Sequence, residues 1–145
     1  NMKFNEFFVG QRFETDSIKV TKEKIMEFAS EFDPQYMHLD EKKTQEGMFG
    51  GIIASGIQTL ATTSSECGLY GEDVVAGTAM DNIRFIKPVY PDDELHVVVE
   101  VINLEDNRKN TGIVTVNLST FNHTTQKIFE GDLSVIIKNN VSLNK

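Results

Sequence analysis

An aspartate and a histidine five residues apart are the clearest candidates for chemistry in this chain. We expect Asp33 and His38 in a short irregular loop between two helical segments. Pro34 disfavours helical backbone at the residue before it, so the helix that begins near Thr21 should end at about Asp33. A chain reversal over residues 33–36 would bring the carboxylate and the imidazole close enough to share one water. Such a pair could act as an acid/base couple on that water.

The position of Asp33 at a helix C-terminus should make it a better base. Unpaired carbonyls and the negative end of the helix dipole disfavour negative charge there, which raises the pKa of a carboxyl group. Burial would act in the same direction. The alternative is a turn in which Asp33 caps a backbone amide and His38 lies on the surface, because short patterns of this kind are frequent by chance.

A glycine-rich segment, FGGIIASG over residues 49–56, leads into a second helix. Ser55 suits the N-cap position, which leaves the N–H groups of Gly56 and Ile57 without partners inside the helix. Those groups could hold a carbonyl oxygen as it gains negative charge, and glycine lets a ligand approach the backbone closely. The alternative is that the glycines only permit a tight entry into a buried helix.

Together these motifs resemble the MaoC-like hydratases and dehydratases of the hotdog fold, which include the (R)-specific enoyl-CoA hydratases. The resemblance covers nearly the whole chain. It is carried by VGQRF (9–13), FA (28–29), FDPQ (32–35), HLD (38–40), FGGIIASG (49–56), RFIKPV (84–89) and DDEL (92–95).

The resemblance implies that Asp33 and His38 activate one water. The hydratase loop of the family commonly reads D-x-N-P-x-H. Here Gln35 replaces the asparagine, Pro34 follows the aspartate directly, and Tyr36 occupies the usual proline position. Many of these hydratases also have a histidine where this chain has Ser55, whereas a subgroup resembles FDPQ-x-x-HLD with FGG-x-x-ASG.

The pattern of apolar residues predicts an α+β fold in one domain over residues 2–145. An antiparallel sheet with short turns has an apolar face that one long helix can cover. The resemblance adds that this is a hotdog fold, with the sheet wrapped around the central helix. Strands are expected over 13–20, 74–86, 94–104, 112–122 and 127–138, and helices over 21–32, 40–46 and 52–66. The central helix is expected to bury Ile57, Leu60, Ala61 and Ser64.

We expect Ser55, Ser64 and Tyr36 in the substrate pocket. Ser64 matches a family serine near the acyl pocket, although it could instead only bond the preceding helical turn. Basic residues at the rim would suit an anionic CoA ester, with solvated surface residues as the alternative for each. The candidates are Arg84 and Lys87 first, then Lys42, Lys43, Arg108 and Lys109.

Charge and composition narrow the class of protein. The net charge of −8 argues against a nucleic-acid or anionic-membrane binder. The single cysteine, Cys67, suits a reducing cytoplasm, and neither a signal peptide nor a membrane span is visible. The histidines show no metal-ligand spacing, so we expect no metal site. Asn1 precedes Met2, and we expect it to be a cloning remnant.

The resulting hypothesis is reversible hydration of a 2-enoyl thioester to the 3-hydroxyacyl thioester, (R)-specific by resemblance and part of fatty acid metabolism. The substrate would be an enoyl-CoA or an acyl-carrier thioester, with no further cofactor. Asp33 would take a proton from water, His38 would orient that water, and the Gly56 N–H would stabilise the thioester oxygen. The resemblance also implies a homodimer, or a dimer of dimers, with sites at the subunit interface.

Two alternatives stay open. A hotdog acyl-CoA thioesterase would need a carboxylate on the central helix, where Glu66 is the only acid and lies near the far end. A non-catalytic acyl-thioester binding protein would keep the pocket without the loop chemistry.

Overall fold

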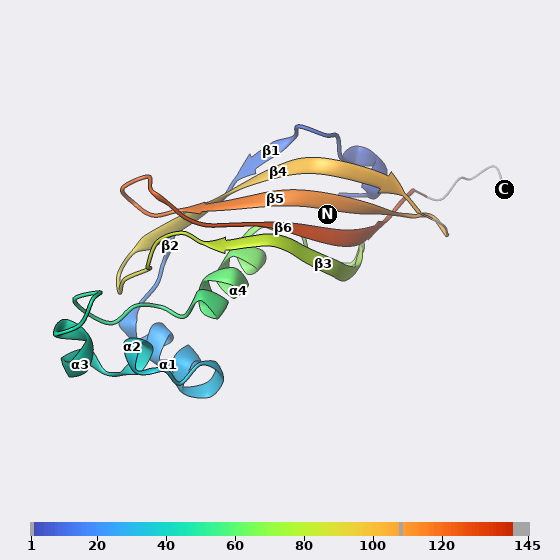
Figure 1. Ribbon diagram of the computed structural model, residues 1–145. Helices are drawn as coiled ribbons and strands as arrows, with labels where there is room; N and C mark the ends of the chain where they lie inside the picture. The colour runs from blue at the N-terminus through green and yellow to red at the C-terminus, as the bar shows by residue number, and fades with distance from the viewer. Residues whose placement is uncertain (1, 108, 141–145) are drawn as a thin grey trace.

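The fold is built on one antiparallel sheet in a computed structural model that describes residues 2–107 and 109–140 (Figure 1). The strands run in the order β1-β4-β5-β6-β3, and β2 pairs with β4 off this path. Their bounds are Arg12–Glu14 (β1), Ile18–Lys19 (β2), Val74–Phe85 (β3), Glu94–Asp106 (β4), Thr111–Phe121 (β5) and Lys127–Lys138 (β6). Strands β3 to β6 therefore confirm the predicted β region, whereas the strand expected over 13–20 is two short strands.

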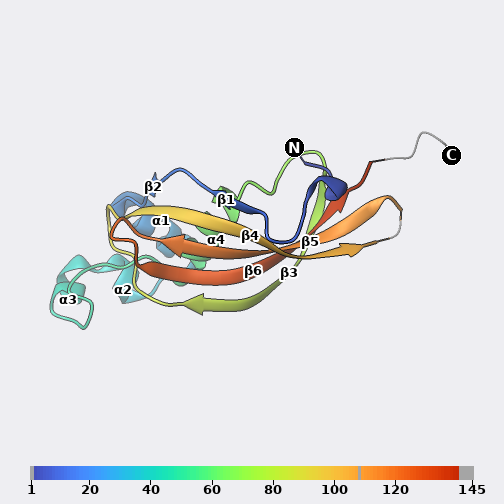
Figure 2. The ribbon, with the colours of Figure 1, turned by 90° about the horizontal axis from the view of Figure 1, so that it is seen from above.

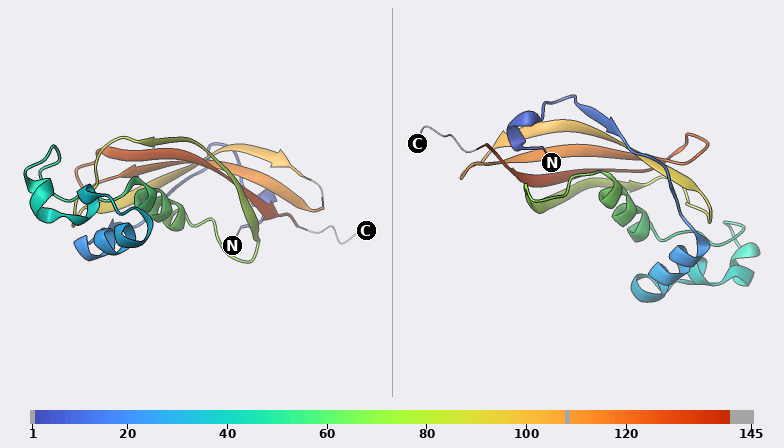
Figure 3. Two further views of the ribbon diagram at one scale, coloured as in Figure 1. Left: turned by 60° about the horizontal axis from the view of Figure 1, so that its bottom comes forward. Right: turned by 180° about the vertical axis from the view of Figure 1, so that it is seen from behind.

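Helix α4 lies on one face of this sheet, and the other α-helices gather beyond one end of it (Figures 1 and 3). The helices are η1 (Phe4–Glu6, a 3-10 turn), α1 (Lys22–Phe32), α2 (Tyr36–Leu39), α3 (Glu41–Gln45) and α4 (Gly56–Glu66). Figure 2 shows η1 at the end of the sheet opposite to α1–α3. None of the described helices combines the length and the hydrophobicity that a membrane span requires.

The apolar core lies on the face of the sheet that α4 covers. Alternate residues of β4 and β5 point to this face because side chains of a strand alternate. Val97, Val99 and Val101 of β4 pack there with Val114 and Val116 of β5, and all five are buried. This alternation confirms the predicted sheet with one apolar face.

The buried face of α4 is polar, which corrects the expected apolar one. Gln58, Thr59 and Thr63 are its buried residues, while Ile57 is 53% exposed. Thr63 and Thr120 of β5 share a buried hydrogen bond of 2.7 Å between their hydroxyl oxygens. Because two hydroxyls satisfy each other, a polar helix face can be buried against the sheet.

Helix α4 begins later than expected. Residues 52–55 belong to no helix or strand, and the Ala54 N–H donates to the Val89 carbonyl at 2.8 Å. The Ser55 hydroxyl accepts the Ile57 N–H at 3.2 Å, which places Ser55 at the N-cap, as predicted. Through this segment the start of α4 reaches Asp33, to which the Ser55 hydroxyl donates a hydrogen bond.

Candidate active site

Asp33 is the C-cap of α1. Its N–H donates to the Ala29 carbonyl at 2.9 Å, and Pro34 follows, so the helix ends where the sequence predicted. The Thr21 hydroxyl caps the other end by accepting the Lys24 N–H. These two ends fix where Asp33 leaves the helix.

His38 lies in a one-turn helix, α2, and not in the expected irregular loop. Its backbone N–H donates to the Gln35 carbonyl at 3.1 Å, which closes the turn. The side chain is buried, with the residue 4% exposed. Burial rules out the alternative in which His38 is a surface residue.

The Asp33 and His38 side chains meet. Nε2 of His38 lies 3.3 Å from Oδ2 of Asp33. The other ring nitrogen, Nδ1, lies 2.7 Å from the Ile53 carbonyl oxygen, which can only accept a hydrogen bond. Nδ1 therefore carries a proton, and in the neutral ring Nε2 presents its lone pair beside the carboxylate. A direct Nε2–H to Oδ2 bond forms only in the imidazolium.

Two neutral donors hold the carboxylate of Asp33. The Ser55 hydroxyl donates to Oδ2 at 2.7 Å, and Nε2 of Gln35 donates to Oδ1 at 2.7 Å. These bonds, with the Ser55 bond first, hold the pKa of the Asp33 carboxyl below its ordinary value because they stabilise the charged form. The expectation that the helix end makes Asp33 a better base is therefore wrong.

Gly56 offers a backbone donor beside the pair. In the described part of the chain no hydrogen bond takes up its N–H, whereas the Ile57 N–H is used by the Ser55 cap. The expected pair of free amides is therefore reduced to one. A Cβ at Gly56 would lie 2.9 Å from the Phe85 ring, so the absence of a side chain lets that ring approach.

Asp33, His38 and Gly56 line the same cavity, of about 690 Å³. Gln35 lines it too, although the sequence identified Gln35 only as a departure from the family loop. Most of the remaining wall is apolar, as expected for a site that holds an acyl chain. Apolar side chains of this wall include Phe32, Met37, Phe49, Ile57, Phe85 and Ile128.

The other predicted site residues lie elsewhere. Ser55 is fully buried behind Asp33 and does not line the described cavity. Tyr36 and Ser64 are also absent from its lining, and the Lys43 ammonium lies 4.4 Å above the Tyr36 ring. Their pocket roles stay predictions.

Among the predicted basic residues, Lys87 lines the cavity. Arg84 lies on β3 opposite Glu130 of β6 and is not part of the described lining. Arg108 lies outside the described residues. Lys87 is thus the cationic residue best placed to meet an anionic substrate.

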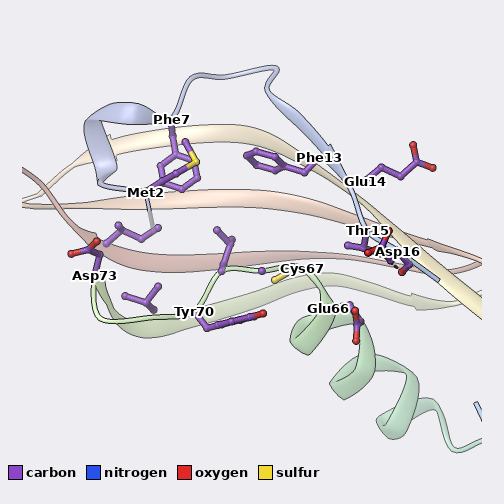
Figure 4. A pocket seen from close by; sticks show the side chains of 14 residues that line it. Met2, Phe7, Phe13, Glu14, Thr15, Asp16, Glu66, Cys67, Tyr70 and Asp73 are labelled. Carbon is purple, nitrogen blue, oxygen red and sulfur yellow. Dashed lines mark hydrogen bonds between the residues drawn. The ribbon is translucent and has the colours of Figure 1, made fainter. Parts of the chain in front are cut away.

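A second cavity, of about 470 Å³, lies at the other end of α4 (Figure 4). Five of its lining residues come from three parts of the chain. Glu66 lies on the last turn of α4, Asp16 and Glu14 on the N-terminal segment, and Cys67 and Tyr70 on the chain after the helix. Glu66 lines this cavity and not the one that holds Asp33. The only acid on α4 is therefore separated from the Asp33–His38 pair.

Comparison with known proteins gives a consistent relationship. A family model for the MaoC-like domain matches residues 5–122. The chain is 58% identical over 140 residues to the uncharacterized protein YdeM of Bacillus subtilis (strain 168), covering 94% of this chain and 99% of YdeM. It is 28% identical over 114 residues to 3-hydroxyacyl-thioester dehydratase Z of Mycobacterium tuberculosis (strain H37Rv), covering 75% of this chain and 74% of that protein.

Solved structures agree in architecture. The MaoC-like dehydratase from Rhodospirillum rubrum has a TM-score of 0.86 at 29% identity, covering 98% of this chain and 100% of that chain. RV0216 of Mycobacterium tuberculosis, described as a double hotdog fold, has a TM-score of 0.85 at 17% identity, covering 99% of this chain and 46% of that chain, and so shares the fold. This chain belongs to the family of MaoC-like domains and has the hotdog fold.

Proposed function

We propose that the protein catalyses reversible hydration of a 2-enoyl thioester to a 3-hydroxyacyl thioester. The observation that carries the proposal is the 3.3 Å contact between Asp33 and His38 on the wall of an apolar cavity, beside the unused Gly56 N–H. The similarity to a 3-hydroxyacyl-thioester dehydratase supports this reaction class. By family resemblance the product would be the (R) isomer.

The proposed reaction starts with a water between the pair and C3 of the substrate. Neutral His38 presents Nε2 as a proton acceptor, because Nδ1 donates to Ile53. Asp33 is the weaker base because its pKa is lowered, so it stays ionised and stabilises the imidazolium. We therefore assign proton transfer to His38 and orientation to Asp33, which reverses the roles expected from the sequence.

The oxygen of the water adds to C3 as its proton passes to His38, and negative charge moves to the thioester oxygen. The Gly56 N–H, at the positive end of α4, would donate to this oxygen. One such donor is worth about 3 kcal/mol in the transition state. Imidazolium then returns the proton to C2, so that one water is added and His38 is neutral again. These steps require no metal and no redox cofactor.

The apolar wall would bind the acyl chain, and Lys87 at this cavity would meet the phosphates of CoA or of a carrier-protein arm. Cytoplasmic location and a role in fatty acid metabolism stay predictions of the sequence.

We further propose a homodimer joined through β3. This strand ends the sheet, so one of its edges has no strand beside it among the described residues, and Val75, Met80 and Phe85 on it are exposed. A long apolar edge of this kind favours pairing with a second copy. Because Phe85 lines the catalytic cavity, such a partner would help to enclose it. Light scattering after size-exclusion chromatography measures the oligomeric state directly. A monomeric wild type would contradict this proposal.

The reaction is tested by the loss of enoyl-thioester absorbance with short- and medium-chain 2-enoyl-CoAs. Wild-type turnover should fall by about 10²–10⁴-fold in Asp33→Asn and in His38→Gln, with both variants folded by circular dichroism. Equal turnover in the folded variants would remove the pair from the mechanism.

The same assay separates the two alternatives. Release of free thiol that is lost in Glu66→Gln would indicate a thioesterase that uses the second cavity. Saturable binding of enoyl-CoA without turnover at any chain length would indicate a binding protein.

A further inference from the structure

Ser55 occupies an unusual position between two parts of the site. The residue is fully buried, and its hydroxyl makes two bonds with opposite roles. It donates to Oδ2 of Asp33 at 2.7 Å and accepts the Ile57 N–H at 3.2 Å. One atom therefore joins the carboxylate at the end of α1 to the first turn of α4.

These bonds restrict how the carboxylate of Asp33 can turn. An ionised carboxylate has about four acceptor positions, two on each oxygen. Oδ2 faces the Ser55 hydroxyl and His38, while Oδ1 faces Gln35. With neutral His38, Nε2 carries no proton, so Ser55 is the donor that holds Oδ2 and Gln35 is the donor that holds Oδ1. The Ser55 residue is fully buried, so the orientation of the carboxylate depends most on this bond.

We infer that Ser55 is a positioning residue that holds the Asp33 carboxylate against His38 and keeps it in register with the Gly56 N–H. This inference rests on the proposed hydratase function. Ser55 does not line the cavity, so its effect would pass through Asp33 and through the start of α4.

The register matters because the two groups act on different atoms of one substrate. The pair handles the proton near C2 and C3, while the Gly56 N–H binds the thioester oxygen. A displacement of about 1 Å between such groups can lower a rate by about 10²-fold. Gln35 is a weaker constraint because its side chain is exposed, so water can compete for its bond to Asp33.

Two substitutions remove the Ser55 hydroxyl and differ in how strongly they weaken the cap of α4. Ser55→Ala loses the bond to Asp33 and also the cap of α4, whereas Ser55→Gly loses the same bond with a much smaller capping penalty. Thr21→Ala is the matched control, because it removes the N-cap of α1 and leaves the Ser55 bonds intact. We expect kcat to fall by about tenfold or more in both Ser55 variants, with KM changed by less than about threefold and Thr21→Ala near wild type. The inference is overturned if kcat falls only in proportion to the loss of thermal stability, so that Ser55→Gly and Thr21→Ala have similar activities.

A second measurement does not depend on turnover. The ¹³C resonance of the Asp33 carboxyl, followed from neutral pH downwards, reports its protonation. Loss of the Ser55 donor should move the midpoint to higher pH in Ser55→Ala and Ser55→Gly, and not in Thr21→Ala. Unchanged midpoints in both Ser55 variants overturn the inference. If wild type turns over no enoyl thioester, the proposed function fails, and this titration still decides the role of Ser55.

Discussion

The His38 imidazole donates from Nδ1 to the Ile53 carbonyl oxygen at 2.7 Å, and this bond links α2 to the segment that precedes α4. The Ile53 N–H in turn donates to the Met37 carbonyl at 3.1 Å, so the two segments are joined in both directions. His38 therefore makes a structural bond through Nδ1 and leaves Nε2 for the proposed proton transfer. Variants of His38 should therefore affect the stability of the fold and the turnover separately.

Replacing His38 by asparagine should keep the structural bond and remove the chemistry. The amide nitrogen of Asn can take the place of Nδ1 and donate to Ile53, but nothing replaces Nε2. We expect His38→Asn to unfold in urea within about 1 kcal/mol of wild type while losing about 10²–10⁴ in kcat. His38→Ala should lose about 1–3 kcal/mol, because the Ile53 carbonyl is left unsatisfied. Full activity in His38→Asn would contradict the assignment of proton transfer to Nε2.

Asp33 should make the stability of the fold depend on pH. A carboxyl whose pKa is lower in the folded than in the unfolded chain stabilises the fold above its unfolded pKa, and this contribution disappears as pH falls through the folded pKa. The difference in unfolding free energy between wild type and Asp33→Asn should thus be constant near neutrality and shrink at pH below the ordinary range of an aspartate. Urea unfolding at a series of pH values measures it.

Asp73→Asn is a useful comparison. The pKa of Asp73 is also lowered, but by the ammonium of Lys3 at 2.8 Å. Salt screens such an ion pair, whereas the bonds to Asp33 come largely from neutral donors. The effect of Asp33→Asn should therefore persist in high salt while that of Asp73→Asn weakens. Equal salt sensitivity would indicate that His38, and not Ser55, dominates the environment of Asp33.

Sequence reasoning recovered those parts of the fold that depend on local pattern. Strand β6 has the predicted bounds, and β4 and β5 differ from theirs by two residues or fewer, because alternating apolar side chains and short turns mark such strands. The Ser55 cap was also predicted, since a cap depends on residue type and local spacing. The proximity of Asp33 and His38 followed from the proline and the chain reversal.

What the sequence missed depends on partners far along the chain. The pKa of Asp33 is set first by Ser55, 22 residues away, and no local rule indicates that bond. The polar face of α4 is buried because Thr120 of β5 satisfies Thr63, which a search for apolar periodicity cannot find. Burial of His38 likewise depends on the segment that contains Ile53.

Gly56 should tolerate a methyl group better in the fold than in the reaction. A Cβ there would meet the Phe85 ring at 2.9 Å. Phe85 is 55% exposed, so its ring can move away from the added methyl group. Gly56→Ala also gains helix propensity, so we expect a stability change within about 1 kcal/mol. Turnover should fall by about tenfold or more if the thioester oxygen has to approach this N–H closely.

The double variant Gly56→Ala/Phe85→Ala shows whether a loss of turnover comes from the contact with the Phe85 ring or from blocked access to the N–H of residue 56. Removing the ring relieves the contact, so in urea unfolding the double variant should be as stable as Phe85→Ala alone, which itself loses the packing of Phe85 on Phe129. Removing the ring should not restore kcat, because the methyl group still blocks the approach to the N–H. Recovery of kcat would show that Phe85, and not access to the backbone donor, caused the loss.

Lys87 should affect the binding of the carrier and not the chemistry. It is the only Lys or Arg in the described lining of the cavity that holds Asp33 and His38. An exposed charge pair is worth about 1 kcal/mol in water, which corresponds to about fivefold in KM. We therefore expect Lys87→Gln to raise KM for an enoyl-CoA by about that factor at low ionic strength, with kcat unchanged. The effect should weaken as salt is added.

A substrate without phosphates and a variant at Arg84 serve as controls for the Lys87→Gln experiment. A short N-acetylcysteamine thioester has no phosphates, so Lys87→Gln should leave its KM unchanged. Arg84→Gln removes a neighbouring charge on β3 that does not line the cavity, and it should change the KM for enoyl-CoA less than Lys87→Gln does. If Arg84→Gln has the larger effect, the anionic part of the substrate crosses the β3 edge of the sheet. The second copy proposed to pair there would then compete for, or share, the same surface.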